Sequence, residues 1–333
     1  MSGEGIIAAQ TENVLISAGD CKVTVLPKFG GKIASIRIGE RELLQTPLAP
    51  IAPRTQTLRF DEGDASGWDE CLPSVAACSV ETGDGIAEVP DHGDLWRVEW
   101  EVQGIGNREQ GTKADCGSDA PVTMTGKCFS LPLEMKRGIA LSETVRGWRL
   151  ELSYTLVNHG KHPAPWSWAA HPLFAAEEGD RIVLPESMTK IRLEGSGGGR
   201  LGKGGDTVGW PVVALANGGT ADLSIAEAPD SGIGDKLFAG PLSASENWCV
   251  LERPSASVRI RVSFDVKATP YLGLWICYGG WPERQGPKQV CVAMEPATAP
   301  VDSLAVTGPW SRTLAPGESF SWSMEVEIER IER

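Results

Sequence analysis

The sequence has 333 residues, of which 41% are hydrophobic and 23% are charged, and its formal net charge is −13. This length and balance are ordinary for a globular protein with a large core, while an acidic chain without a lysine or arginine cluster argues against nucleic acid or an anionic membrane as partner. No apolar run approaches the roughly 18 residues that a membrane-spanning helix needs.

The N-terminus and the eight cysteines bear on the compartment. Residues 1–7 lack a basic segment followed by an apolar one, so they are not typical of a signal peptide. No CxxC pair occurs, which disfavours a zinc knuckle or a thioredoxin-type motif. Cys249, Cys277 and Cys291 lie in apolar runs, where a free thiol behaves as a small hydrophobe. We expect a cytoplasmic protein with reduced thiols.

Alternation of apolar and polar residues recurs along the chain and predicts half-buried strands. Its clearest runs cover residues 96–102, 148–156, 258–266 and 320–328. The 39 glycines and 23 prolines fall mainly between such runs, as turns require, and no long stretch has the apolar period of a helix. We therefore predict an all-β fold, a large antiparallel β-sandwich with few short helices.

Three segments interrupt this pattern, namely residues 104–120, 195–206 and 215–234. Alternation resumes on both sides of each segment with similar composition, so we interpret them as loops rather than linkers and expect a single domain over residues 1–333. The glycine-rich second segment lacks the order Gly-x-x-x-x-Gly-Lys-Ser/Thr and is therefore not a phosphate loop.

Residues 162–174 contain two of the four histidines of the chain. A histidine titrates near neutral pH and is therefore suited to acid–base catalysis. His171 follows two tryptophans and precedes Pro172, which predicts that it lies where a strand gives way to a loop. The faces of these tryptophans, Trp168 among them, suit the apolar face of a sugar ring. We interpret His171 as a catalytic acid, although a lone histidine is more often structural.

Carboxylates are the other candidates. Glu295 ends the apolar run 290–294 and precedes a proline, so partial burial would raise its pKa towards that of a useful base. Asp69 and Glu70 stand beside a tryptophan, and Asp235 begins a short apolar run. Taken alone, each of these is typical of a solvated strand end, loop or turn.

The order of these pieces resembles the aldose 1-epimerases, or galactose mutarotases, over nearly the whole chain. The matching pieces are Gly30-Gly31, Pro90-Asp-His-Gly, Ala170-His-Pro-Leu-Phe, Asp235-Lys-Leu-Phe, Met294-Glu-Pro and Leu314-Ala-Pro-Gly-Glu. The resemblance implies a galactose mutarotase-like β-supersandwich with a sugar cleft on one concave sheet. It further implies that His171 protonates the ring oxygen and that Glu295 takes the proton of the anomeric hydroxyl. His92 and Asp235 would hold the sugar.

The chain departs from that family at residues 67–73, where the mutarotases carry an Asn-Arg pair. Here Asp69 and Glu70 replace a basic substrate contact, which leaves the identity of the sugar open and would repel a phosphate. Arg97 and Lys236 are the cations that would compensate if they face inward.

The resemblance implies an isomerase that interconverts the α and β anomers of a monosaccharide by acid–base ring opening, without cofactor or metal, as a monomer or homodimer. Two alternatives stay open. A sugar-binding protein on the same scaffold would bind without turnover. A polysaccharide lyase or glycosidase is the other, and a retaining glycosidase needs two carboxylates about 5 Å apart, for which Asp69 or Glu70 with Glu295 is the candidate pair.

Overall fold

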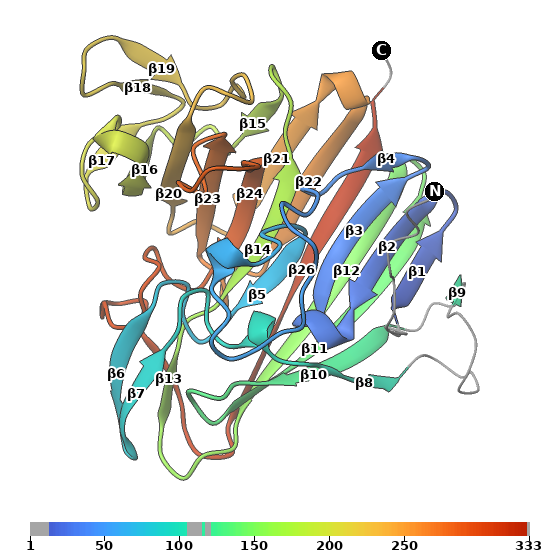
Figure 1. Cartoon of the computed structure of the whole chain (residues 1–333), viewed down its shortest axis with the longest axis vertical. Helices are drawn as coiled ribbons and strands as arrows, with labels where there is room; N and C mark the ends of the chain where they lie inside the picture. The colour runs from blue at the N-terminus through green and yellow to red at the C-terminus, as the bar shows by residue number, and fades with distance from the viewer. Residues whose placement is uncertain (1–12, 105–114, 117–120, 332–333) are drawn as a thin grey trace, which may run out of the picture.

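The computed structural model describes residues 13–104, 115–116 and 121–331, whose regular structure is almost entirely β-strand (Figure 1). The helices within these ranges are short 3-10 turns: η1 (Pro27–Phe29), η2 (Phe60–Glu62), η3 (Leu95–Arg97), η4 (Gly197–Gly199) and η5 (Pro254–Ala256). The predicted all-β class and the scarcity of helix are confirmed. Within the described ranges, no helix has the length and apolar character needed to cross a membrane.

The first sheet has 12 strands and carries most of the predicted site residues. In spatial order its strands are β17 (Thr207–Gly209), β16 (Lys190–Ser196), β20 (Ile233–Ala239), β23 (Tyr271–Tyr278), β24 (Val290–Ala297), β14 (Ala169–Ala175), β5 (Trp68–Cys71), β3 (Lys32–Ile38), β2 (Cys21–Leu26), β1 (Val14–Ala18) and β9 (Asp115–Cys116), with β4 (Arg41–Glu42) paired to β3. The ladders between these strands are antiparallel, as predicted, except that of β1 with β9.

The second sheet has 8 strands and packs against the first (Figure 1). Its order is β15 (Arg181–Val183), β21 (Trp248–Arg253), β22 (Val258–Phe264), β26 (Ser319–Arg330), β12 (Gly147–Asn158), β11 (Leu133–Thr144), β10 (Val122–Lys127) and β8 (Glu101–Gly104). Buried apolar side chains of both sheets form one cluster, in which Ile33 of β3 and Leu150 of β12 are fully buried. Period-two alternation explains this core, because each strand turns its apolar face inward.

Three small strand pairs complete the described structure. They are β13 (Ala164–Trp166) with β25 (Arg312–Leu314), β18 (Val212–Ala214) with β19 (Thr220–Asp222), and β6 (Cys78–Thr82) with β7 (Gly85–Val89). The second pair corrects the interpretation of residues 215–234 as a loop, since this segment contains β19 and the start of β20. Most of the loop predicted at 104–120 lies outside the described residues. The seven cysteines with described side chains are free.

Three of the four alternating runs are strands of the second sheet, β12, β22 and β26, and they bury alternate residues as predicted. The fourth run, residues 96–102, is not one strand, because η3 occupies its start and β8 begins only at Glu101. Arg97, on the polar side of that alternation, is buried. It turns inward because its guanidinium donates hydrogen bonds to backbone carbonyl groups of two loops.

Candidate active site

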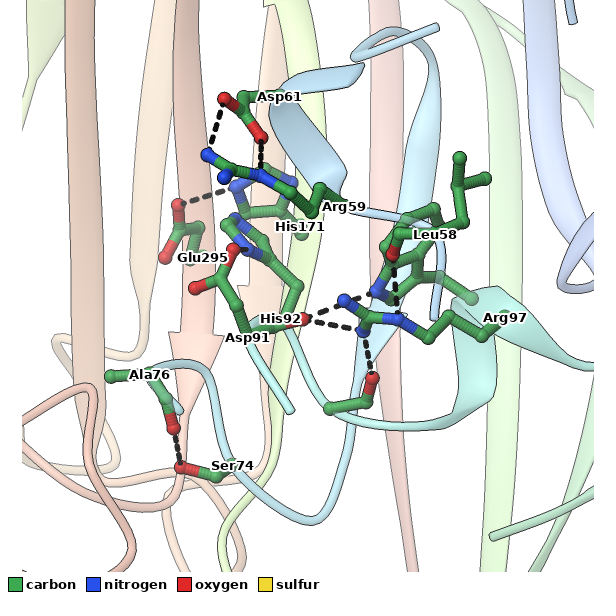
Figure 2. A network of polar contacts seen from close by, with 12 residues as sticks. Leu58, Arg59, Asp61, Ser74, Ala76, Asp91, His92, Arg97, His171 and Glu295 are labelled. Carbon is green, nitrogen blue, oxygen red and sulfur yellow. Dashed lines mark hydrogen bonds and ion pairs between the residues drawn. The ribbon is translucent and has the colours of Figure 1, made fainter. Parts of the chain in front are cut away.

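His171 and Glu295 lie on neighbouring strands of the first sheet and face each other. Strand β14 pairs Ala169 with Ala297 of β24, and the same register sets His171 opposite Glu295. Side chains opposite each other on antiparallel strands lie on the same face of the sheet. Figure 2 shows the two side chains pointing toward each other. The Nε2 of His171 is 3.6 Å from the Oε1 of Glu295, which is too long for a hydrogen bond.

The prediction that His171 lies where a strand gives way to a loop is wrong. The residue lies inside β14, and Pro172 pairs with Trp68 of β5 within the same sheet. The ladder to β24 is interrupted between Ala169 and Leu173, which accommodates a proline that has no N–H to donate. The imidazole is therefore held by a strand with neighbours on both sides.

A pocket of about 380 Å³ opens at this face of the sheet. This volume lies at the lower end of the range of roughly 300–1,000 Å³ that small-molecule sites occupy. The residues that line it are Arg59, Phe60, Asp61, Val75, Ala76, Asp91, His92, His171, Lys236, Trp275, Trp281, Gln289 and Asp302. Glu295 is fully buried directly behind two of them, His171 and Lys236.

The two oxygens of Glu295 have different partners. Lys236 Nζ donates a hydrogen bond to Oε2 and lies 3.6 Å from Oδ1 of Asp302. Gly273 of β23 is opposite Glu295, and a Cβ at that position would lie 2.7 Å from Oε2, so only glycine leaves room for the carboxylate. In contrast, Oε1 of Glu295 and Nδ1 of His171 are buried without a hydrogen-bond partner among the described residues.

The electrostatics of the site shift the pKa values of this pair in opposite directions. Burial raises the pKa of Glu295, and the charge of Lys236 opposes that rise. Burial also lowers the pKa of His171 well below its usual range, and His92 and Lys236 act in the same direction. Burial lowers the pKa of Lys236, but Asp302 and Glu295 outweigh it and raise that pKa above its usual value. Lys236 is therefore a permanent cation beside the pair.

His92 and Phe60 form one wall of the pocket. His92 occupies a turn with φ of 58°, and its Nδ1 lies 2.8 Å from Oδ2 of Asp91. Its ring stacks on Phe60 with centroids 3.7 Å apart, and its centroid is 5.2 Å from that of His171. The structure thus brings His92 to the pocket beside His171, where the resemblance implied a sugar contact.

Arg97 does not belong to the pocket lining, and Figure 2 shows its guanidinium directed at backbone carbonyl groups near Leu58 and His92. Its Nε donates to the carbonyl of Leu58 at 2.9 Å, and its Nη1 donates to the carbonyls of Asp91 and Gly93. Leu58 belongs to the segment that carries Phe60, and Asp91 and Gly93 flank His92. Arg97 therefore fastens two loops together and does not line the pocket, contrary to its predicted place in substrate binding.

Asp69 lies on β5, opposite His171, and not in a loop. Its carboxylate accepts a hydrogen bond from Lys32, whose Nζ is also 3.2 Å from Asp64, and Asp64 in turn pairs with Arg54 at 2.8 Å. All four side chains are at most 2% exposed. Asp69 is therefore neutralised beneath the pocket and does not line it.

Glu70 points to the opposite face of β5, because successive side chains of a strand alternate. There it lies between the two sheets, where Oε1 accepts hydrogen bonds from Arg137 at 2.9 Å and from Tyr154 at 3.0 Å. Its Oε2 accepts one from the indole of Trp168 at 2.9 Å. The prediction that Glu70 and Trp168 contact a sugar is wrong, because both side chains lie between the sheets and not at the pocket. Glu70 therefore cannot form a glycosidase pair with Glu295 at this pocket.

Strand alternation also separates Asp235 from Lys236 on β20. Lys236 lines the pocket, whereas the carboxylate of Asp235 accepts hydrogen bonds from Arg200 Nε at 2.9 Å and from Ser196 Oγ at 2.6 Å. The cation of the Asp-Lys pair, rather than its predicted acid, therefore reaches the pocket.

Sequence reasoning missed several residues of the lining. Trp275 of β23 donates its indole N–H to Oε1 of Gln289 at 2.9 Å, and the ring of Trp281 lies 6.1 Å from that of Phe60. Trp275 lies on the same face of its strand as Gly273, but no pattern in the sequence marks either residue as part of the site. Among the described residues, no group of three or more His, Cys, Asp and Glu side chains is arranged to hold a metal ion.

No protein-family model and no curated protein matches the sequence, but solved structures match nearly the whole of this chain. The Slr1438 protein from Synechocystis sp. PCC 6803 has a TM-score of 0.69 at 16% identity, with 99% of this chain and 100% of that chain covered. A galactose mutarotase-like protein from Lactobacillus casei ATCC 334 has a TM-score of 0.62 at 18% identity, covering 95% and 100%. A galactose mutarotase related enzyme from Lactobacillus acidophilus has a TM-score of 0.63 at 16% identity, covering 96% and 100%.

Proposed function

We propose that this chain, which has the galactose mutarotase-like fold, is an isomerase of the aldose 1-epimerase type that interconverts the α and β anomers of a neutral monosaccharide. The observation that carries the proposal is the pair His171 and Glu295, which meet at a pocket of small-molecule size with an unpaired buried atom each. Asp69 Oδ1 and Asp302 Oδ1 near the pocket also lack a hydrogen bond, so the proposal depends on the two groups facing each other and not on the unpaired atoms alone.

Anomer interconversion needs two proton transfers. The unpaired Oε1 of Glu295 takes the proton of the C1 hydroxyl while protonated His171 gives a proton to the ring oxygen, so the C1–ring oxygen bond breaks as the aldehyde forms. Rotation about C1–C2 followed by the reverse transfers closes the ring with the other configuration. Each such transfer contributes about 10²–10⁴-fold to the rate.

The position of Glu295 behind the pocket lining requires a small adjustment when sugar binds. The side chains of His171 and Lys236 separate Oε1 from the pocket. Catalytic hydrogen bonds are commonly long in ligand-free enzymes and tighten in the complex. The raised pKa of Glu295 suits a group that takes a proton, and the lowered pKa of His171 makes its protonated form a stronger acid.

The charges of the lining favour a neutral sugar. Its two cations are both paired in the described structure: Arg59 with Asp61 at 2.9 Å, and Lys236 with Glu295 and with Asp302. A phosphate or carboxylate group on a sugar is normally bound by an Arg or Lys that is available to it. An anionic group would have to compete with a carboxylate for either cation, although Arg59 is exposed and its ion pair is weak.

The test is to add the protein to freshly dissolved α-glucose, α-galactose and further α-aldoses and to follow anomer exchange by ¹H NMR. We expect exchange faster than in buffer with at least one of them, and a loss of about 10²–10⁴-fold in His171→Ala. The anomer exchange of glucose 6-phosphate, tested alongside, should be accelerated less than that of the neutral sugars. Tight sugar binding without exchange would instead indicate a sugar-binding protein, and release of reducing ends from an oligosaccharide would indicate a glycosidase.

A further inference from the structure

We infer that Lys236 is a positioning residue for Glu295: its ammonium group keeps the buried carboxylate ionised and fixes Oε1 as the oxygen that takes the proton. The catalytic meaning of this inference rests on the proposed function, whereas the electrostatic role rests on the geometry alone.

The route by which Lys236 reaches Glu295 is specific to this sheet. Lys236 is opposite Trp275, and Glu295 is opposite Gly273 two residues away, so the lysine spans strand β23 diagonally. It crosses where Gly273 has no side chain, and a Cβ there would meet the bound oxygen Oε2 at 2.7 Å. Glycine thus permits the contact.

The contact divides the carboxylate into two different oxygens. Oε2 accepts the hydrogen bond of Lys236, while Oε1 faces Nε2 of His171 and has no hydrogen-bond partner in the described structure. A carboxylate held by one oxygen cannot rotate freely, so the base atom is chosen before the sugar arrives. Lys236 thus positions the carboxylate through this hydrogen bond.

Among the described residues, Lys236 is the one Lys or Arg side chain that pairs with Glu295. The titratable groups that act on Glu295 come from several elements. They are Lys236 of β20, His171 of β14, Cys71 of β5, Cys291 of the same strand β24, Asp302 after that strand, and His92 of the turn at the pocket wall. Asp302 opposes ionisation, because it carries the same charge as Glu295. A buried carboxylate without a compensating cation takes up a proton. Lys236 is therefore the group that prevents this.

Two substitutions of opposite sign test the inference. Lys236→Met removes the cation, so the pH at which Glu295 titrates should rise by about 1–3 units. Asp302→Asn removes a like charge and should lower it. Lys236→Arg keeps the cation and should leave the titration near that of the wild type. Structural damage alone would not shift the two neutralising variants in opposite directions.

The measurement is ¹³C NMR of the labelled Glu carboxyl groups, with the Glu295 signal assigned by its absence in Glu295→Gln, as a function of pH in the ligand-free protein. The kcat/KM profile for anomer exchange is recorded in parallel. It should move to higher pH in Lys236→Met, because Lys236 also lowers the pKa of His171.

An unchanged Glu295 titration in Lys236→Met, or a shift of the same sign in Asp302→Asn, would overturn the inference. If the wild type does not accelerate exchange, the proposed function fails, while the titration still decides the role of Lys236. If Lys236→Met does not fold, Lys236→Gln, which removes the charge but keeps a polar side chain, carries the same test, with the same expected rise and the same overturning result.

Discussion

Two glutamates of the first sheet are equally buried and differently bonded. Glu70 and Glu295 are both fully inaccessible to solvent. Glu70 faces the core between the sheets, where Arg137, Tyr154 and Trp168 occupy both of its oxygens. Glu295 faces the pocket and has one donor on one oxygen and none on the other in the described structure. Burial alone therefore does not mark a functional carboxylate, and Glu295 is distinguished by a free oxygen that faces a histidine at a pocket.

The largest effect should come from Glu295→Gln. We expect anomer exchange to fall by about 10²–10⁴-fold, because an amide cannot accept the C1 hydroxyl proton. The melting temperature should change little, since Lys236 keeps its contact with Asp302. Exchange by ¹H NMR and thermal unfolding of the same preparation measure both quantities. Exchange at the wild-type rate in this variant would show that Glu295 is not the catalytic base.

Glu70→Gln should give the opposite pattern. It leaves the guanidinium of Arg137 buried without an opposite charge, and breaking a buried ion pair typically costs about 3–5 kcal/mol. Chemical denaturation should show this loss in the free energy of unfolding, while exchange per folded molecule stays at the wild-type rate. Lost exchange with unchanged stability would mean that Glu70, too, reaches the chemistry.

Asp235→Asn should have a smaller effect on stability and none on binding. Its carboxylate holds Arg200 and Ser196 away from the pocket, and hydrogen bonds to a charged group contribute about 1.5–3 kcal/mol. We expect a lower free energy of unfolding and an unchanged KM. A raised KM would restore the sugar contact that the family resemblance implied for this residue.

The pH dependence of kcat/KM sharpens the comparison without a substitution. Glu295 must be ionised, so activity falls as the pH drops through its pKa, which burial has raised. His171 must be protonated, so activity also falls as the pH rises through its pKa, which burial has lowered. The expected profile is bell-shaped, and a profile that rises steadily with pH would contradict the assignment of His171 as the acid.

The sequence was sufficient for the fold class and for three of its long strands, because alternation is a local property that survives folding. It failed at residues 96–102 for a reason that is not local. Arg97 is drawn inward by the carbonyl of Leu58, which is 39 residues away, and no pattern around Arg97 reports that partner.

The candidate site shows the same division. The motifs located the segments that meet at the pocket, but they did not assign faces, so Asp235 was chosen where Lys236 faces inward. The expectation that acids at residues 67–73 would repel a phosphate was also misplaced. Buried cations distant in sequence neutralise both acids. Lys32 pairs with Asp69, and Arg137 of the second sheet pairs with Glu70. A neutral substrate is instead favoured by the paired cations of the lining.

Arg97 has a consequence for which ligands can enter. Its single guanidinium is bonded to the backbone of the segment that carries Phe60 and to the backbone of the turn that carries His92. The two backbone segments are therefore fastened to each other. A ligand that requires them to separate must break these hydrogen bonds together, so a residue outside the pocket lining limits how far this wall can open.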